Sequence, residues 1–545
     1  MASPLRELIP ENAYRADPGL RPALVALLPA DVLAWAEPQL DEVGRLARTI
    51  ADWGDECERQ PAKLVSVEPW GDRVDEVVYP AAWWRLKAAA ARTGCVALPY
   101  EEETRRVAGP HGRTVHAALS LLFEPQAATY FCPVAMTDAA VRVISDFGPD
   151  ELRERYLARF LDRDGARAWT AGQWMTEQQG GSDVGANRVE ARLENGAWRL
   201  YGRKFFCSNV GGEVVLALAR PQGGGPGTRG LGLFAIPRLL PDGRRNSYRI
   251  DRLKDKLGTR AMATGEVTLD GAYADQVGEL EQGFAQMTPM LNITRLQNAI
   301  SSVAGMRRGL LLARAYAARR SAFGRLLEAQ PLHRSVLTEL AADGEACLLL
   351  VLRLAQLLGK VEQRSAAPDE ELLFRVGTSL TKLYTAKRAV AAASEMVESF
   401  GGPGYMEDTG VPRLLRDAQV LPIWEGTTNV LSLDTLRVLA KPGVAAAFDA
   451  ELERLQSPGR AKAEKVLRAV SAAGVEGGQR GARALAFTLA EAWVAGLLKD
   501  AAGRGRREAA VFAAWQRRGE LNLEDLFDEV VDGVQARYVK VAASS

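Results

Sequence analysis

The sequence predicts a mainly helical protein with a β-domain in the middle of the chain. Residues 1–168 and 281–442 repeat apolar side chains at helical spacing, whereas residues 169–280 alternate apolar and polar side chains between turns. A chain of 545 residues is too long for one compact core. We therefore expect four parts: an N-terminal helical domain, the β-domain, a helical bundle, and a helical extension over residues 443–545.

The N-terminal region is predicted to be helical between breaks such as Gly94 and Pro99. Pro133 is expected to end one helix, and Thr137 or Asp138 to cap the next. The reason is that proline cannot continue a helix, and short polar side chains bind free N–H groups at a helix start. The expected helices cover residues 23–46, 81–91, 114–122 and 138–144.

The β-domain is predicted from short alternating segments separated by turns rich in Gly, Asn and Asp. A glycine-rich loop at 223–230 joins two of these segments. It lacks the Gly-Lys-Ser/Thr ending of a phosphate-binding loop and no helix follows it, so we interpret it as a hairpin loop. The expected strands cover residues 189–193, 198–200, 214–218, 231–236 and 266–269.

The helical period returns at Phe284 and continues to the end of the chain. The segments 299–320, 332–359 and 370–400 are long enough for bundle helices. Residues 365–369 are typical of a loop followed by a helix start. The helical extension follows, interrupted by glycines.

Composition and charge argue against several classes of protein. The net charge is +1, with 69 basic and 68 acidic residues, so no overall field favours nucleic acid or a membrane surface. The five cysteines form no Cys-x-x-Cys pair and the three histidines lack ligand spacing. This disfavours a disulfide scaffold, a metal site and Ser-His-Asp chemistry. We find no run long enough to span a bilayer, and we expect a cytoplasmic protein.

The segment Ile423-Trp424-Glu425-Gly426-Thr427-Thr428-Asn429 has the features of a general-base site. Ile423 and Trp424 can exclude water and so raise the pKa of the Glu425 carboxyl towards working pH. Gly426 permits close approach to the backbone, and the polar residues after it can form hydrogen bonds at a helix start. Taken alone, such a glutamate is more often a simple loop residue, so the rest of the chain decides.

Two stretches of the predicted β-domain carry further polar groups. The glycines of Met175-Thr176-Glu177-Gln178-Gln179-Gly180-Gly181-Ser182-Asp183-Val184 permit a tight loop whose N–H groups and hydroxyls can face a ligand. The second stretch, Gly202-Arg203-Lys204-Phe205-Phe206-Cys207-Ser208-Asn209, places a hydroxyl after an aromatic pair at the end of a strand. Each stretch alone is weakly specific, and the two phenylalanines could belong to the core.

Together, in this order and spacing, these stretches resemble the acyl-CoA dehydrogenase family over roughly residues 130–440. The long helical N-terminus, with Val74 to Val77 and Cys132 to Thr137, is similar to the AidB branch of this family, named after an alkylation-response protein. The paired glutamines after Glu177 and the helical extension are similar to the same branch. The other matching motifs are Lys256-Leu257-Gly258-Thr259-Arg260, Thr294-Arg295, Arg320-Ser321-Ala322-Phe323-Gly324, Phe400-Gly401-Gly402-Pro403-Gly404-Tyr405, Arg416-Asp417 and Trp424-Glu425-Gly426-Thr427.

The resemblance implies an N-terminal helical domain, a middle antiparallel β-barrel and a C-terminal four-helix bundle, with FAD in the cleft between them. Thr176 and Ser208 match the family positions whose hydroxyls bind the flavin ring. Phe206 stands where the family usually has a tryptophan packed against the flavin. Arg320 matches an arginine that reaches the FAD of a neighbouring subunit, which implies a homotetramer. The other positions expected at FAD are Met175, Ser182 (at the pyrophosphate or the CoA arm), Gly402, Thr427 and Asn429, with Glu398 where many members have glutamine.

The resemblance also implies that Glu425 is the base of an acyl-CoA dehydrogenase. Glu425 would remove the α-proton of an acyl-CoA while the flavin takes a hydride from the β-carbon, leaving a trans-2-enoyl-CoA. The backbone N–H of Glu425 and a flavin ribityl hydroxyl would stabilise the developing enolate. Arg295, Trp424 and Gly426 are expected at the substrate, whose acyl chain we expect to be short or branched. Electrons would pass to an electron-transfer flavoprotein or to oxygen.

Other interpretations stay open at this stage. The enzyme could be an acyl-CoA oxidase, or a flavin oxidase for a non-CoA substrate, although the Glu425-Gly426 pair disfavours the latter. A non-catalytic scaffold is disfavoured because the base is present. An AidB-like protein could bind DNA through its extension, but a DNA-binding surface needs a patch of one sign. In the extension the basic and acidic residues nearly cancel, which argues against such a patch. The basic residues are Arg504, Arg506, Arg507, Arg517 and Arg518, and the acidic ones are Glu508, Glu520, Glu524, Asp525, Asp528 and Glu529.

Overall fold

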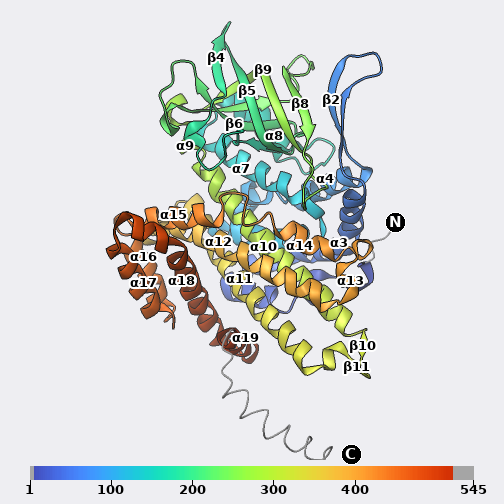
Figure 1. Cartoon of the computed structure of the whole chain (residues 1–545), viewed down its shortest axis with the longest axis vertical. Coiled ribbons are helices and arrows are strands. Elements are labelled where there is room, and N and C mark those ends of the chain that lie inside the picture. Colours follow the sequence, from blue (N-terminus) through green and yellow to red (C-terminus); the bar gives the residue numbers. More distant parts are fainter. Residues whose placement is uncertain (1–4, 519–545) are drawn as a thin grey trace, which may run out of the picture.

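The computed structural model describes residues 5–518 of the chain. A β-barrel lies above a layer of long helices, and the last helices form a group at one side of that layer (Figure 1). The predicted fold class, in which helices precede a β-domain, a helical bundle and a helical extension, is confirmed. The interface between barrel and helices is the feature that matters for function.

The N-terminal helices bury one apolar face each. On α3 (Ala30–Arg59), Leu40, Ala47 and Ile50 are buried at helical spacing. The helix α7 (Phe131–Phe147) lies directly under the barrel (Figure 1). The other helices of this region are α1 (Ala13–Ala16), α2 (Leu20–Leu27), α4 (Ala81–Thr93), α5 (Glu102–Val107), α6 (Gly112–Phe123) and α8 (Asp150–Phe160).

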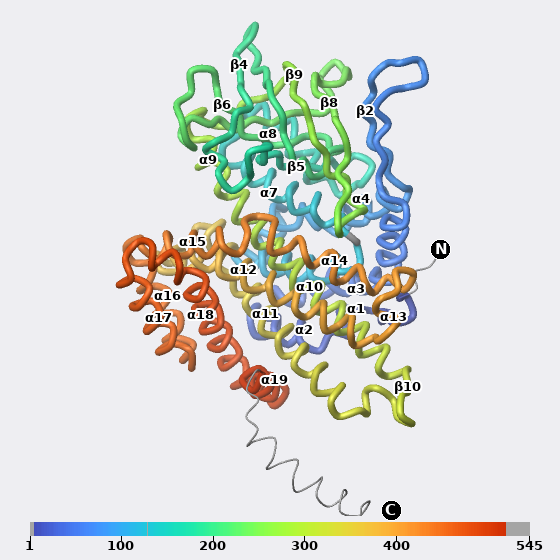
Figure 2. The backbone as a smooth tube through the Cα atoms, viewed as in Figure 1, coloured from blue at the N-terminus to red at the C-terminus, as the bar shows by residue number. Residues whose placement is uncertain are grey.

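A hairpin inside this helical region was missed by the sequence prediction. It consists of β1 (Lys63–Val67) and β2 (Arg73–Val78), and Figure 2 shows it standing beside the barrel. In β1 the two valines Val65 and Val67 are exposed and no residue is fully buried, so no buried apolar face marks the strand. Arg73 ties the hairpin to the barrel by donating to the backbone oxygen of Ile250 at 3.1 Å.

The prediction for the start of α7 was wrong. Pro133 lies in the first turn of the helix, where an N–H has no partner within the helix and its absence costs little. Thr137 does not cap this helix: its hydroxyl donates to the backbone oxygen of Pro133 at 2.6 Å and accepts from the N–H of Ala171 at 2.8 Å. Asp138 is buried and paired with Arg113 at 2.9 Å. Tertiary contacts therefore explain both polar residues.

The barrel is closed because its strands pair in a ring. The strand β6 (Val214–Pro221) pairs with both β4 (Glu190–Glu194) and β7 (Gly232–Pro237), while β5 (Ala197–Ser208) and β9 (Thr264–Val277) complete the circle. The antiparallel pairing of β6 with β7 confirms the hairpin at 223–230. Most pairs are antiparallel, and β6 is parallel to β4 and to β3 (Ala171–Trp174). The remaining strand, β8 (Tyr248–Leu253), was not predicted.

Four helices form the bundle below the barrel. The first of them, α10 (Thr288–Ala317), packs against α11 (Pro331–Glu362) and α12 (Pro368–Ser399), and α15 (Thr428–Leu439) packs on α12. The predicted start after residue 365 is correct, since Glu370 accepts from the N–H of Ala367 at 3.1 Å and closes the first turn of α12. Short elements connect them: α9 (Gly283–Gln286), β10 (Ser321–Ala322), β11 (Arg325–Leu326), α13 (Gly402–Tyr405) and α14 (Pro412–Ala418).

The helical extension packs on the bundle as part of the same core. Trp493 of α18 (Gly474–Ala502) is fully buried and lies across Phe448 with ring centroids 5.8 Å apart. We predicted no segment able to span a bilayer; α18 does have that length and hydropathy, with 61% of its apolar window buried inside the structure. Packing against α11 and α15 explains its apolar character. The other helices here are α16 (Val444–Arg454), α17 (Arg460–Ala472) and α19 (Arg506–Arg517).

Candidate active site

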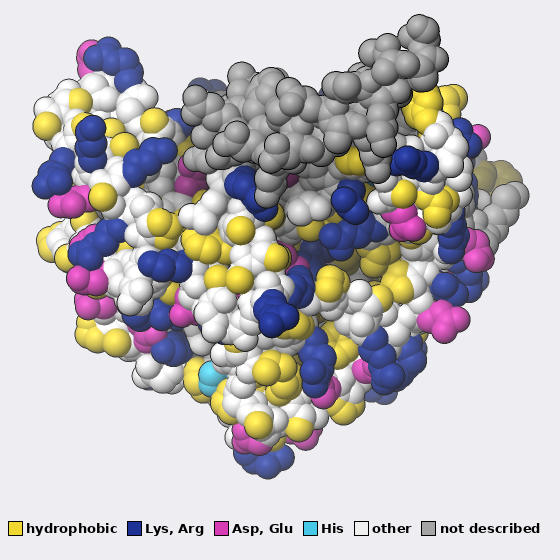
Figure 3. Space-filling view, turned by 90° about the horizontal axis from the view of Figure 1, so that it is seen from below, with side chains coloured by type: hydrophobic (Ala, Val, Ile, Leu, Met, Phe, Trp, Pro, Cys, Tyr) yellow, Lys and Arg dark blue, Asp and Glu magenta, His cyan; other side chains and the backbone are white. Residues whose placement is uncertain are grey.

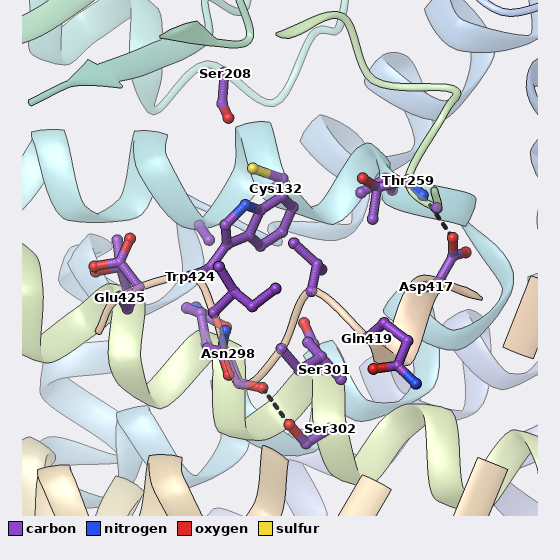
Figure 4. Close-up of a pocket in the computed structure, with 18 of the residues that line it drawn as sticks. Cys132, Ser208, Thr259, Asn298, Ser301, Ser302, Asp417, Gln419, Trp424 and Glu425 are labelled. Atoms are coloured by element: carbon purple, nitrogen blue, oxygen red, sulfur yellow. Dashed lines mark hydrogen bonds between the residues drawn. The ribbon is translucent and has the colours of Figure 1, made fainter. Parts of the chain in front are cut away.

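A cavity of about 780 Å³ lies between the barrel and the helices. Its walls come from the loop after β3, the end of β5, the buried side of α7, the length of α10, and the segment that joins α14 to α15 (Figure 4). Most of the residues predicted for cofactor or substrate line it, namely Met175, Thr176, Ser182, Phe206, Ser208, Arg295, Trp424, Glu425, Gly426 and Thr427.

The backbone around Glu425 is strained. Glu425 has a φ of 58° and Gly426 a φ of 105°, so two successive residues are in the region of positive φ. This region is unfavourable for a residue with a Cβ, and it persists only where the surroundings impose it. Thr427 then caps α15, its side-chain oxygen accepting from the N–H of Val430. The turn places the Glu425 side chain at the cavity rather than within the helix.

The Glu425 carboxyl has a pKa above its ordinary value. Burial raises this pKa, because a carboxylate loses hydration in the protein interior. A hydrogen bond from Thr294 Oγ1 to Glu425 Oε2 of 2.7 Å, and the nearby charges of Arg295 and Lys382, act in the opposite direction. A carboxylate with a raised pKa and a neutral hydroxyl partner is suited to accept a proton.

Two basic side chains bind the backbone oxygens of Glu425 and Gly426. Arg295 Nε donates to the backbone oxygen of Glu425 at 3.3 Å, while Arg295 Nη1 lies 3.3 Å from Asp434 Oδ2. Lys382 of α12 is fully buried and donates from Nζ to the Gly426 oxygen at 2.6 Å. Burial lowers the Lys382 pKa to about 7. Lys382 was not among the predicted site residues, since no local sequence pattern distinguishes a lysine that points inwards.

The barrel side of the cavity is anchored by a buried ion pair. Glu177 Oε1 accepts from Lys204 Nζ at 2.8 Å, and the same carboxylate accepts from the N–H groups of Arg188 and Val189. This pair fixes the loop that carries Thr176 and Ser182. A Cβ on Gly181 would lie 2.5 Å from Thr176 Oγ1, so the loop needs glycine there.

Two motifs join the barrel to the helices at the far side of the cavity. Asp417 Oδ1 accepts from the N–H of Thr259 at 2.6 Å (Figure 4). A Cβ on Gly258 would lie 2.4 Å from the Arg416 oxygen, so the two backbones can approach only with glycine. The structure therefore gives Lys256 to Arg260 and Arg416-Asp417 a role in joining the two parts.

The structure does not bring every predicted cofactor residue to this cavity. Arg320 and Gly402 line a separate cavity of about 460 Å³, together with Glu398. Asn429 is exposed, and its Oδ1 accepts from Arg483 of α18 at 3.2 Å. Phe206, which could have belonged to the core, is 52% exposed and borders the main cavity.

Comparisons with known proteins place the chain in a family. Its three parts match "Adaptive response protein AidB N-terminal domain" over residues 5–164, "Acyl-CoA dehydrogenase, middle domain" over 172–272 and "Acyl-CoA dehydrogenase, C-terminal domain" over 281–440. Acyl-CoA dehydrogenase family member 11 of Caenorhabditis elegans is 39% identical over 473 residues, which cover 85% of this chain and 76% of that protein. The chain belongs to the acyl-CoA dehydrogenase family.

Other relatives agree with this assignment. AidB of Escherichia coli is 35% identical over 492 residues, covering 84% of this chain and 86% of AidB. The crystal structure of ACDH-11 of Caenorhabditis elegans in complex with C11-CoA has a TM-score of 0.88 at 35% identity, covering 95% of each chain. The present protein is thus an acyl-CoA dehydrogenase, an oxidoreductase, of the AidB-like branch.

The cofactor of this enzyme is FAD, and the barrel wall suits it. A solved acyl-CoA dehydrogenase from Bacillus anthracis complexed with FAD shares the fold with a TM-score of 0.70 at 17% identity. In the present chain Thr176 and Ser208 offer hydroxyls to the cavity, and Phe206 offers an exposed aromatic face. Gln173 Oε1 is buried at the same wall with no hydrogen-bond partner within residues 5–518. These groups are suited to hold a polar, planar ring.

Proposed function

We propose that the enzyme removes hydrogen from the α- and β-carbons of an acyl-CoA thioester to give a trans-2-enoyl-CoA, with Glu425 as the base. The observation that carries the proposal is the Glu425 carboxyl itself. It faces the cavity, burial raises its pKa, and a neutral hydroxyl holds one of its oxygens. Bound FAD supplies the hydride acceptor for this chemistry.

The surrounding residues prepare Glu425 for proton removal. Thr294 orients the carboxyl, so that one oxygen is held while the other can receive the α-proton. Arg295 and Lys382 bind the backbone oxygens of Glu425 and Gly426, which fixes the turn that carries the Glu425 N–H for the thioester oxygen. The indole of Trp424 borders the same space and helps to exclude water (Figure 4).

An anaerobic titration tests this function. The FAD-loaded protein is titrated with a panel of straight and branched acyl-CoAs while the flavin absorbance is followed, for the wild type and for Glu425→Gln. Bleaching by one class of thioester in the wild type, lost in a variant that still holds FAD, supports the proposal. If FAD is bound and no thioester bleaches it, the dehydrogenase proposal fails. The same reduced protein, exposed to oxygen or to an electron-transfer flavoprotein, identifies the electron acceptor.

We also propose that the enzyme is a homotetramer in which the second cavity receives part of a neighbouring subunit's FAD. Arg320 and Gly402 line this cavity away from Glu425, which suits residues that serve another subunit. Arg320→Ala is then expected to lower FAD occupancy and to weaken the tetramer. Sedimentation velocity with flavin quantification checks both, and a monomeric FAD-loaded wild type would contradict the proposal.

DNA binding by the helical extension has less support. Arg507 is paired with Glu345 at 2.7 Å, and Arg518 lies 3.5 Å from Glu491 and also contacts Asp343. Figure 3 views the molecule from below relative to Figure 1, and basic and acidic side chains are interspersed on the face seen there. Paired charges weaken a phosphate-binding surface. The residues Glu520, Glu524, Asp525, Asp528 and Glu529 of this hypothesis lie outside the described residues.

A further inference from the structure

One wall of the main cavity carries a row of polar side chains, although most of the lining is apolar and an acyl chain is mostly hydrocarbon. On α10 the residues that line the cavity follow one face away from the base: Thr294, then Asn298, then Ser301 and Ser302. With a rise of ~1.5 Å per residue, Asn298 lies roughly 6 Å and Ser301 roughly 10 Å along the helix from Thr294. A chain whose α-carbon meets Glu425 can therefore pass along this face.

This face is the buried direction of the cavity. Asn298 is 6% exposed and Ser302 is fully buried. The CoA portion is large and polar and needs a path to solvent, so the acyl group is the part that fits inwards. Figure 4 shows Asn298, Ser301 and Ser302 along α10, with Gln419 on the segment that follows α14.

Asn298 has hydrogen-bonding capacity that the protein does not use. Neither its Oδ1 nor its Nδ2 has a hydrogen-bond partner within residues 5–518, although both atoms are buried. An unsatisfied buried amide is unfavourable, so native interiors rarely keep one without a reason. A plain hydrocarbon would leave both atoms unsatisfied, whereas one hydroxyl or amide can donate to Oδ1 and accept from Nδ2.

Burial disfavours charge at this end of the cavity. Arg413 is paired with Asp55 at 2.7 Å, and Arg416 contacts Glu407. Burial lowers the pKa of the Arg308 guanidinium to about 10 and raises the pKa of the neighbouring Glu124 carboxyl to about 8. A ligand group placed here would lose its hydration in the same way, which favours a neutral polar group over an ionised one.

We propose that the preferred substrate is an acyl-CoA whose acyl chain carries a neutral hydrogen-bonding group, a hydroxyl or an amide, several carbons beyond the thioester, and that Asn298 with Ser301 binds this group. The proposal rests on the dehydrogenase function proposed above and specifies its substrate class. A site built around polar side chains discriminates strongly against an analogue that lacks the matching group. Asn298 and Ser301 thus act as specificity residues.

The test compares thioesters of equal carbon number on the FAD-loaded protein. Dissociation constants for hexanoyl-CoA, 6-hydroxyhexanoyl-CoA and adipoyl-CoA are measured by flavin absorbance perturbation in Glu425→Gln, where binding is separated from chemistry. Rates of anaerobic flavin reduction are measured in the wild type, and the series is repeated at eight carbons. We expect one of the hydroxylated thioesters to bind at least tenfold more tightly than its plain partner and to reduce the flavin faster.

Variants locate the preference. Asn298→Leu is expected to remove the tenfold ratio or invert it, and Ser301→Ala, a milder change, to reduce it. Asn292→Leu, on the same helix but outside the cavity lining, serves as the matched control and should keep the ratio. FAD content and thermal melting confirm that each variant is folded.

The outcomes separate this proposal from the proposed function. Three results would overturn the specificity proposal even where the flavin is bleached. Plain and hydroxylated thioesters could bind equally well, or the carboxylated thioester could bind most tightly. The third is a ratio of plain to hydroxylated dissociation constants that neither Asn298→Leu nor Ser301→Ala changes. Selective binding without bleaching would keep the specificity and overturn the dehydrogenase function. If no thioester binds at all, both proposals fall.

Discussion

Two glutamates on opposite sides of the cavity have carboxyls whose pKa values are shifted in opposite directions. On the barrel side, Glu177 is buried within the protein, and its pKa is lowered because Lys204 and backbone N–H groups stabilise its charge more than burial disfavours it. On the helical side, burial raises the pKa of Glu425; among the described residues its carboxylate accepts a hydrogen bond from the Thr294 hydroxyl only, while Lys382 donates to the backbone oxygen of Gly426. The partner, more than the burial, decides which carboxylate is structural and which can act as a base.

The largest effect is expected when the charge of Glu425 is removed. Glu425→Gln is expected to lower the rate of substrate-dependent flavin reduction by roughly 10²–10⁴-fold, the usual range for loss of a general base. Because the folded-state pKa is raised, the stability linked to this group is present at low pH and is lost as pH rises through that pKa. The variant should therefore melt at the same temperature as the wild type or higher at neutral pH. A strongly destabilised variant would show that Glu425 is structural.

The barrel wall should respond in the opposite manner. Lys204→Met leaves the Glu177 charge buried without its cation, and we expect a loss of about 3–5 kcal/mol in the free energy of unfolding. Urea unfolding at pH 7 measures this loss, and the double variant with Glu177→Gln should recover part of it. A stability equal to that of the wild type would remove the distinction drawn between the two walls.

Lys382 offers a sharper test on the helical wall. Lys382→Met removes the donor to the Gly426 oxygen, and we expect roughly a tenfold lower rate of flavin reduction from a displaced Glu425, about 1.4 kcal/mol. FAD binding should be retained. Lys387→Met, on the same helix, is the matched control. An unchanged rate and an unchanged pH profile would mean that Lys382 does not position the base.

The smallest expected effect concerns Thr294. Thr294→Val removes the hydrogen bond that lowers the pKa of the Glu425 carboxyl, so this pKa should rise further. Since the base must be deprotonated, the acidic limb of the rate–pH profile should move to higher pH, while the rate at high pH changes by only a few-fold. Stopped-flow flavin reduction between pH 5 and pH 9 measures both. A shift to lower pH would contradict the assigned role of this hydroxyl.

The motif around Glu425 could be recognised in the sequence because its features are neighbours in the chain. Trp424, Gly426 and Thr427 flank the base, and all four residues line the cavity. Gly402 and Asn429 were recognised in the same way, yet the structure places them away from the main cavity, and Arg320, expected at a neighbouring subunit's FAD, lines the second cavity. Matching a motif gives the identity of a residue but not the surface that it faces.

Alternation and helical spacing alone determined the order of helical, β and helical regions, because both patterns depend on residues a few positions apart. Folding decided the rest: that Lys382 reaches Gly426 across 44 positions of sequence, that Lys204 finds Glu177, and that Asn298 lines a cavity with both amide atoms unsatisfied among the described residues. These contacts depend on which helical and barrel faces meet, and no short-range pattern records that meeting. For this protein the sequence indicated the chemistry, while the tertiary structure determined the electrostatic setting of Glu425 and the polar side chains along one wall of the cavity.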